Sequence, residues 1–301
     1  MKITTVLDVA MSGTYQTWRH ATESGKAAQR YTRDALARYE GKLPGADADP
    51  VFNACGLTSD DYWYRPGMAM LEKYGFHARS MRMNSHGFAG IPTDAKDVRP
   101  QVERYLEQLN RVGIKAERVH GAGDSEGGLI WRQALTTDKQ LRPLVSGLTT
   151  NGTPHGGIRL CASDGLTQRT EHLWITPPGA RDLLISSPIM RDMNAAWDDT
   201  LAAMRTLDPS FRVNSVASRL ASHEHDGLVP VHSAWLPGDP EVVTNFVTPG
   251  KHSLNYAFGR DHTENFQTLM ACFGSTDPAH IARATQANAV AQSLAAQRAL
   301  R

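Results

Sequence analysis

A serine flanked by glycines lies near the middle of the chain, in the run GDSEGG at residues 123–128. The run fits the pattern G-x-S-x-G, whose glycines permit a turn too tight for side chains and push the serine hydroxyl clear of the backbone. An apolar segment at 116–122 precedes it and a helical pattern at 126–135 follows, so the turn joins a predicted strand to a predicted helix. The amino end of that helix, with the N–H of Glu126, would face an anion formed at the serine. A glycine-rich turn without chemistry also fits the run, but the pattern favours Ser125 as a nucleophile that attacks a carbonyl carbon.

An aspartate and a histidine that could serve this serine follow it in the chain. Asp226 comes after a predicted strand at about 212–218, although Asp-Gly is also a common turn pair. His262 lies beyond a predicted strand at about 242–248. The order nucleophile, acid, base is one of the known orders of serine triads. This order makes Asp226 the candidate acid, and it leaves two candidate bases, His262 and His252, of which His252 follows the last strand more directly.

Strands and helices alternate after residue 50. Apolar runs predict strands at about 51–54, 76–83, 116–122, 145–150, 212–218 and 242–248, and helical spacing predicts helices at about 66–74, 97–112 and 126–135 and from 277 onward. This alternation predicts the α/β class, with a doubly wound and mostly parallel sheet. Functional groups in such sheets gather beyond the carboxyl ends of the strands. Residues 1–49 are predicted to form an N-terminal extension, and residues 50–301 the catalytic domain.

The composition argues against several classes of function and site. The chain has 301 residues, a formal net charge of +1 and no run of Lys or Arg, so we do not expect a nucleic-acid partner. No apolar stretch approaches the roughly 18 residues of a membrane span. The first residues lack the apolar run of a secretory signal, which leaves the location open between the cytoplasm and a signal-independent route of export. Three cysteines without a C-x-x-C pair predict neither a disulfide framework nor a zinc cluster.

Five segments together resemble the bacterial triacylglycerol lipases, including the pseudomonad type. They are VFNACGLT at 51–58, LTTNGTPHGG at 148–157, HDGLVPVHSA at 225–234, RDHTEN at 260–265 and the stretch 277–294, in addition to the serine motif itself. The resemblance runs from about residue 50 to the end of the chain and leaves residues 1–49 without an interpretation. The chain differs from the family at Cys55 and Asp124, where those lipases have histidine. For Cys55, a small packed residue is the favoured interpretation over a reactive thiol.

The resemblance implies an α/β-hydrolase fold and a carboxylic-ester hydrolase whose triad is Ser125, Asp226 and His262. It implies that the backbone N–H groups of Leu57 and Glu126 form the oxyanion hole, that the substrate is an ester or a lipid, and that contact with a lipid surface is transient. No cofactor is expected. The family also suggests a structural calcium near Glu264 and Gln267, and a lid within residues 158–199.

Two other functions are compatible with these motifs. An acyltransferase or a thioesterase would use the same triad with a different acceptor or substrate. An inactive hydrolase-fold protein that binds a partner is the non-enzymatic alternative, and the changed residues Cys55 and Asp124 motivate it.

Overall fold

A computed structural model describes residues 43, 45–83, 86–158, 177–220, 223–261 and 263–274. The predicted N-terminal extension lies mostly outside these residues, and the helix predicted from residue 277 lies wholly outside them. The described end of the extension packs against the turn after residue 73, because the Gly45 N–H donates to the Tyr74 carbonyl over 2.9 Å.

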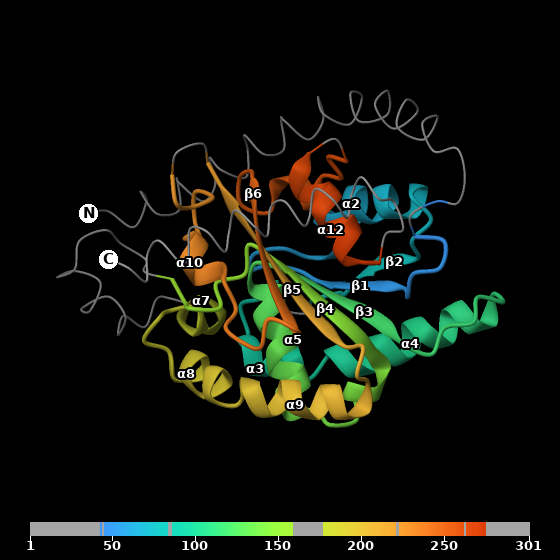
Figure 1. The fold of residues 1–301 in the computed structure, drawn as a ribbon, viewed down its shortest axis with the longest axis horizontal. Coiled ribbons are helices and arrows are strands. Elements are labelled where there is room, and N and C mark those ends of the chain that lie inside the picture. The colour runs from blue at the N-terminus through green and yellow to red at the C-terminus, as the bar shows by residue number, and fades with distance from the viewer. Residues whose placement is uncertain are drawn as a thin grey trace.

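A sheet of six parallel strands forms the centre of the molecule (Figure 1). The strands are β1 (Val51–Ala54), β2 (Ala78–Ser80), β3 (Val119–Asp124), β4 (Val145–Asn151), β5 (Arg212–Arg219) and β6 (Val243–Pro249), in the spatial order β2-β1-β3-β4-β5-β6. Every neighbouring pair is parallel. All six carboxyl ends therefore meet at one edge of the sheet, as the alternation of strands and helices predicts.

Helices cover both faces of this sheet (Figure 1). The helices α2 (Asp61–Lys73), α11 (Leu254–Ala257) and α12 (Glu264–Cys272) lie on one face, and α3 (Ile91–Ala95), α4 (Val98–Arg111), α5 (Glu126–Thr137), α8 (Pro188–Ala195) and α9 (Trp197–Leu207) on the other. The short elements α7 (Pro178–Asp182), α10 (Val231–Ala234) and the 3₁₀ turn η1 (Arg142–Leu144) complete the described structure. Buried side chains fill both layers, with Phe52 and Trp131 in edge-to-face contact at a centroid distance of 6.4 Å.

Several helices differ from the sequence prediction, and α2 and α9 illustrate the physical reasons. Helix α2 begins at Asp61 rather than near Pro66, because Asp60 caps it by accepting the Tyr62 N–H over 2.9 Å and Pro66 is tolerated inside it. Helix α9 is not predicted from the sequence. It buries Trp197, Leu201 and Met204 on one side, a narrow apolar stripe that several polar residues interrupt.

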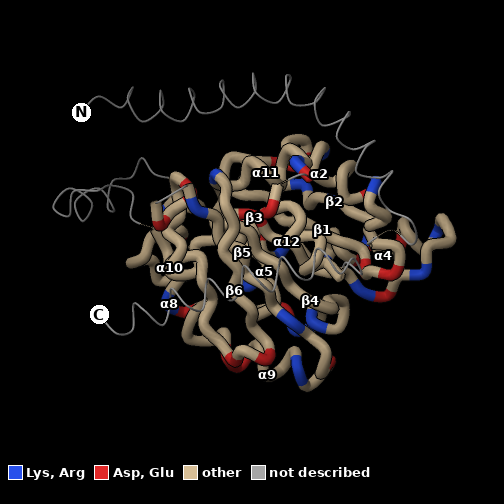
Figure 2. Tube along the Cα trace, turned by 45° about the horizontal axis from the view of Figure 1, so that its top comes forward, with Lys and Arg blue, Asp and Glu red and all other residues tan. Residues whose placement is uncertain are grey.

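Charged residues of both signs are interspersed along the described chain (Figure 2). None of the described helices is long and apolar enough to span a membrane. The strand predicted at 76–83 is confirmed only over its central three residues, Ala78–Ser80.

Candidate active site

Ser125 occupies a sharp turn between β3 and α5. Its backbone has φ 54° and ψ −122°, a conformation that side-chain-bearing residues rarely adopt. A Cβ at Gly123 would lie 2.5 Å from the backbone of Gly128, and a Cβ at Gly127 would lie 2.0 Å from the Ala54 carbonyl oxygen. Both positions therefore require glycine, as the G-x-S-x-G pattern predicts.

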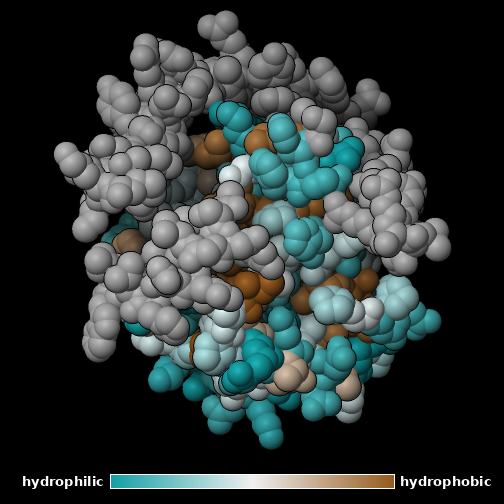
Figure 3. All heavy atoms as spheres, turned by 90° about the vertical axis from the view of Figure 1, so that its left-hand side faces the viewer, coloured by the Kyte–Doolittle hydropathy of each residue, from teal (hydrophilic) through white to brown (hydrophobic). Residues whose placement is uncertain are grey.

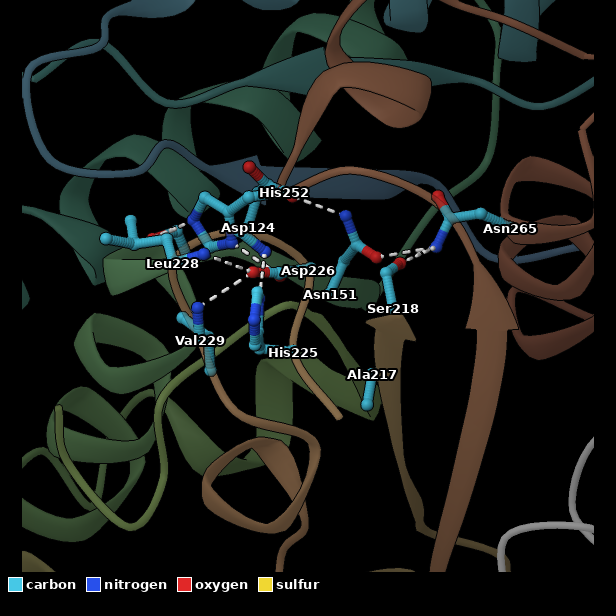
Figure 4. A network of polar contacts seen from close by, with 12 residues as sticks. Asp124, Asn151, Ala217, Ser218, His225, Asp226, Leu228, Val229, His252 and Asn265 are labelled. Carbon is cyan, nitrogen blue, oxygen red and sulfur yellow. Dashed lines mark hydrogen bonds and ion pairs between the residues drawn. The ribbon is translucent and has the colours of Figure 1, made fainter. Parts of the chain in front are cut away.

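A hydrogen-bonded chain of three side chains includes this serine. His252 Nε2 lies 2.9 Å from Ser125 Oγ, and His252 Nδ1 lies 2.7 Å from Asp226 Oδ2. The other oxygen of Asp226 accepts the backbone N–H groups of Leu228 and Val229, at 2.9 and 2.7 Å. Figure 4 shows Asp226 fixed in this way beside His252. The arrangement can move a proton from the serine to an imidazole that a carboxylate orients.

The imidazole of His252 sits in a negative environment. Burial acts to lower the pKa of His252, but the hydrogen bond and charge of Asp226, together with the charge of Asp124, outweigh burial and raise it. The site therefore stabilises the protonated ring, which is the form produced when the serine gives up its proton.

The histidine in this position is His252, not the predicted His262. His262 lies outside the described residues, and the ring that contacts both Ser125 and Asp226 belongs to His252. The reason is the chain path: β6 ends at Pro249, and the His252 N–H then donates to the Asp226 carbonyl over 3.0 Å. The geometry therefore favours the alternative, His252, as the candidate base.

The two segments predicted to supply oxyanion donors come together near the serine. A Cβ at Gly56, the residue before Leu57, would lie 3.0 Å from Ser125 Cβ. A Cβ at Gly87 would lie 3.1 Å from Leu57 Cα and 2.3 Å from Glu126 Oε2, so Leu57 and Glu126 pack against the same residue. Both backbones therefore border the serine, and their assignment as donors remains a prediction.

The side chain of Glu126 is fully buried, and its carboxyl oxygens lie near Gly87 and Gly179. Burial raises its pKa to about 9, and the nearby carboxylates of Asp94 and Asp182 add to this effect. Neither carboxyl oxygen has a hydrogen-bond partner among the described residues. Glu126 is therefore neutral at pH 7 and does not oppose a negative oxyanion.

Asp124 is held by a network of polar residues, of which Asn151 and Asn265 lie in the lipase-like segments 148–157 and 260–265. Tyr64 Oη donates to Asp124 Oδ2 over 2.5 Å, and Asn151 Nδ2 donates to Oδ1 over 2.5 Å. Asn265 Nδ2 in turn donates to Asn151 Oδ1 over 2.9 Å (Figure 4). Asn151 directly follows a predicted strand, but neither this position nor the two segments predict the contact with Asp124.

Cys55 fits the interpretation as a packed residue. It is fully buried, its thiol donates to the Met81 carbonyl over 3.6 Å, and burial raises its pKa well above the ordinary value. A thiol in this state is a poor nucleophile.

The predicted calcium site involves Glu264, in the first turn of α12, and Gln267. Within the described ranges, no group of three or more His, Cys, Asp or Glu side chains is arranged to hold a metal ion. The calcium therefore remains a prediction.

The predicted lid region is described only in part. Leu173–Ile175 falls outside the described residues. Leu183 and Leu184 are buried, whereas Ile185 beside them is 54% exposed. The described part of the region, α7 and α8, thus combines core packing with an exposed apolar residue.

Comparison with solved structures identifies proteins of similar architecture. A mature lipase from Bacillus licheniformis, BlEst2, matches with a TM-score of 0.56 and 17% identity over 75% of this chain and 94% of its own. The phospholipase PlaB from Legionella pneumophila matches with a TM-score of 0.58 and 14% identity over 82% of this chain and 64% of its own. Lipase B from Aspergillus fumigatus matches with a TM-score of 0.53 and 11% identity over 80% of this chain and 57% of its own.

At these identities the likeness concerns the fold. The scan against family models finds no match, and the search of curated proteins finds none either. The parallel sheet, its flanking helices and these neighbours show that the chain has the α/β-hydrolase fold.

Proposed function

We propose that this protein is a serine carboxylic-ester hydrolase of the lipase type. The observation that carries the proposal is the chain of hydrogen bonds from Asp226 through His252 to Ser125, with lengths of 2.7 and 2.9 Å. Nucleophile, base and acid are thereby in contact and in the order that acyl transfer requires. The lipase resemblance of the sequence motifs and the lipase and phospholipase structures of the same fold also support it.

Acylation follows from the geometry. His252 Nε2 takes the proton from Ser125 Oγ as the oxygen attacks the ester carbonyl carbon. The resulting oxyanion accepts hydrogen bonds from the backbone N–H groups of Leu57 and Glu126. Asp226 holds the tautomer of His252 that accepts at Nε2 and stabilises the imidazolium. The imidazolium then gives its proton to the leaving alcohol, and an acyl-serine remains.

Deacylation reverses these roles with water. His252 takes a proton from a water molecule, whose oxygen attacks the acyl carbon and forms a second oxyanion in the same hole. Collapse of this intermediate returns the proton to Ser125 Oγ and releases the carboxylic acid.

Exposed apolar side chains, one of them next to the site, favour a substrate with an apolar acyl chain. Large hydrophobic residues that are exposed in the described structure include Tyr62, Phe88, Ile185 and Leu228. Leu228 is 55% exposed and lies two residues from Asp226. Figure 3 shows several separate hydrophobic areas between hydrophilic residues on one face of the molecule. Such exposure fits a transient contact with a lipid surface.

The test is hydrolysis of p-nitrophenyl esters that range from short to long acyl chains. We expect activity in the wild-type protein and loss of nearly all of it in Ser125→Ala. Ser146→Ala is the matched control, because Ser146 lies at the amino end of β4 and its hydroxyl donates to the Val119 carbonyl. A wild-type protein inactive on every ester, or an active Ser125→Ala variant, would overturn the proposal.

The molecule that accepts the acyl group distinguishes a hydrolase from an acyltransferase, and the substrate bond distinguishes an esterase from a thioesterase. Hydrolysis requires that water capture the acyl-enzyme even when an alcohol is added, whereas an acyltransferase would divert most of the acyl group to the alcohol. Preference for thioesters over oxygen esters of the same acyl chain would indicate a thioesterase. The inactive alternative predicts no reaction of Ser125 with a fluorophosphonate.

A further inference from the structure

A second buried carboxylate stands beside the catalytic histidine. Asp124 immediately precedes Ser125, is fully buried, and lies close to His252 (Figure 4). Its charge acts on His252, and that of His252 acts on it. Asp226 is therefore not the only anion that His252 faces.

The hydrogen bonds of Asp124 favour its ionised form. Asn265 Nδ2 donates to Asn151 Oδ1, which turns the Asn151 amide so that its Nδ2 donates to Asp124. Tyr64 donates to the other oxygen, and burial and the Asp124 charge raise the pKa of Tyr64 well above its ordinary value, so the hydroxyl keeps its proton. Both oxygens of Asp124 thus accept hydrogen bonds, one from a neutral hydroxyl and one from an amide N–H.

Among the described residues whose charge acts on Asp124, His252 is the one able to become positive. Cys55, Tyr64 and Tyr256 feel the charge of Asp124, and each is neutral or negative. Burial raises the pKa of Asp124, and the charge of His252 is the largest influence in the opposite direction. A buried carboxylate without another cation gains most when the imidazolium forms.

We propose that Asp124 is a positioning residue for the reaction, a second carboxylate that stabilises the imidazolium of His252 together with Asp226. The inference rests on the proposed function, since it concerns the same base. Asp124 takes no proton: the proton moves from Ser125 Oγ to His252 Nε2 and on to the leaving group, while Asp124 contributes its charge. The Tyr64–Asn151–Asn265 network holds that charge in place.

The variant Asp124→Asn tests this with little disturbance of the network. An amide at this position accepts from Asn151 through its oxygen. Its N–H group faces Tyr64 Oη, which would then accept a hydrogen bond and turn its own hydrogen away from position 124. We expect the acidic limb of kcat/KM against pH to move to lower pH by about one unit, and the plateau to fall by up to about tenfold. Thr248→Val is the control, because it removes a hydroxyl that accepts from Asn265 and keeps both carboxylates.

An acidic limb that coincides in Asp124→Asn and the wild type would overturn the inference, as would an equal shift in Thr248→Val. A second measurement needs no variant at position 124. In the wild-type protein, the ¹³C signal of the Asp124 carboxyl group should show a step at the pH at which His252 titrates, and absence of that step would also overturn it. The step can be observed even in a protein that hydrolyses no ester, so failure of the proposed function and failure of this inference remain distinguishable.

Discussion

His252 Nε2 lies 2.9 Å from Ser125 Oγ, although 127 residues separate the two in the chain. The parallel sheet brings them together: Ser125 follows β3 and His252 follows β6, and both strands end at the same edge. The contact makes His252 the histidine that the proposed function requires as its base.

Replacement of this histidine should abolish activity. We expect His252→Ala to lower kcat by about 10³-fold or more, because Ser125 then has no group to take its proton. The measurement is steady-state hydrolysis of a p-nitrophenyl ester. His262→Ala is the matched control and should retain most of the wild-type activity; the opposite ranking of the two variants would restore His262 as the base.

Asp226 should affect kcat because it sets the tautomer of the His252 imidazole. Asp226→Asn keeps an oxygen for the Leu228 and Val229 N–H groups but presents an amide N–H to His252 Nδ1. His252 would then carry its proton on Nε2, where it cannot accept from Ser125, and kcat should fall by about 10⁴-fold. Circular dichroism and the unfolding midpoint should stay close to those of the wild type. Retained activity in this variant would show that another group orients the ring.

Glu126 should make the stability of the protein depend on pH. In the unfolded chain it ionises near the ordinary value of 4.5, whereas in the fold its pKa is about 9. Between these values the folded state binds more protons, so the free energy of unfolding falls as pH rises, by at most about 1.4 kcal/mol per pH unit from this group. Glu126→Gln should therefore show a flatter dependence of Tm on pH from about pH 6 to about pH 9.

The control for this experiment is Glu117→Gln, which changes an exposed glutamate. It should follow the wild-type dependence of Tm on pH. Parallel curves for the wild type and Glu126→Gln would mean that Glu126 is already ionised in the folded protein at neutral pH.

The turn that carries the nucleophile should tolerate no methyl group. A Cβ at Gly127 would lie 2.0 Å from the Ala54 carbonyl oxygen, and both are backbone positions inside the sheet and helix layers. We expect Gly127→Ala to lower the free energy of unfolding by about 3 kcal/mol in urea titrations. Gly113→Ala provides the comparison, because φ is +86° there but no atom lies within 4 Å of the added Cβ. It should cost only about 1 kcal/mol; equal losses in the two variants would contradict the close packing around Ser125.

The sequence predicts the fold and part of the site because those signals are local. The G-x-S-x-G pattern between an apolar run and a helical pattern identifies the turn at Ser125, and the alternation of elements predicts the parallel sheet that the structure has. Asp226 is found because it follows a strand. Its contact with His252, in contrast, depends on how the folded chain brings the segments after β5 and β6 together.

The remaining features depend on chain path and packing rather than on pattern. His252 reaches the serine because the segment after Pro249 turns sharply, with Ser253 at φ 57°. That conformation is not encoded in a motif, and a resemblance at 260–265 favoured the other histidine. The network around Asp124 joins Tyr64, Asn151 and Asn265, from α2, β4 and α12, and no periodicity relates residues so far apart.

Because the six strands are parallel, all of their amino ends lie on one side of the sheet and all of their carboxyl ends on the other. The turn at 112–116, between α4 and β3, enters the sheet at the edge opposite the serine, and its Val112 is 72% exposed. A domain or an affinity tag inserted into this turn would extend from the side of the amino ends, and Ser125 on the opposite side would stay accessible. The turn at 112–116 is therefore a site at which the protein can be immobilised or fused without changing the residues around Ser125.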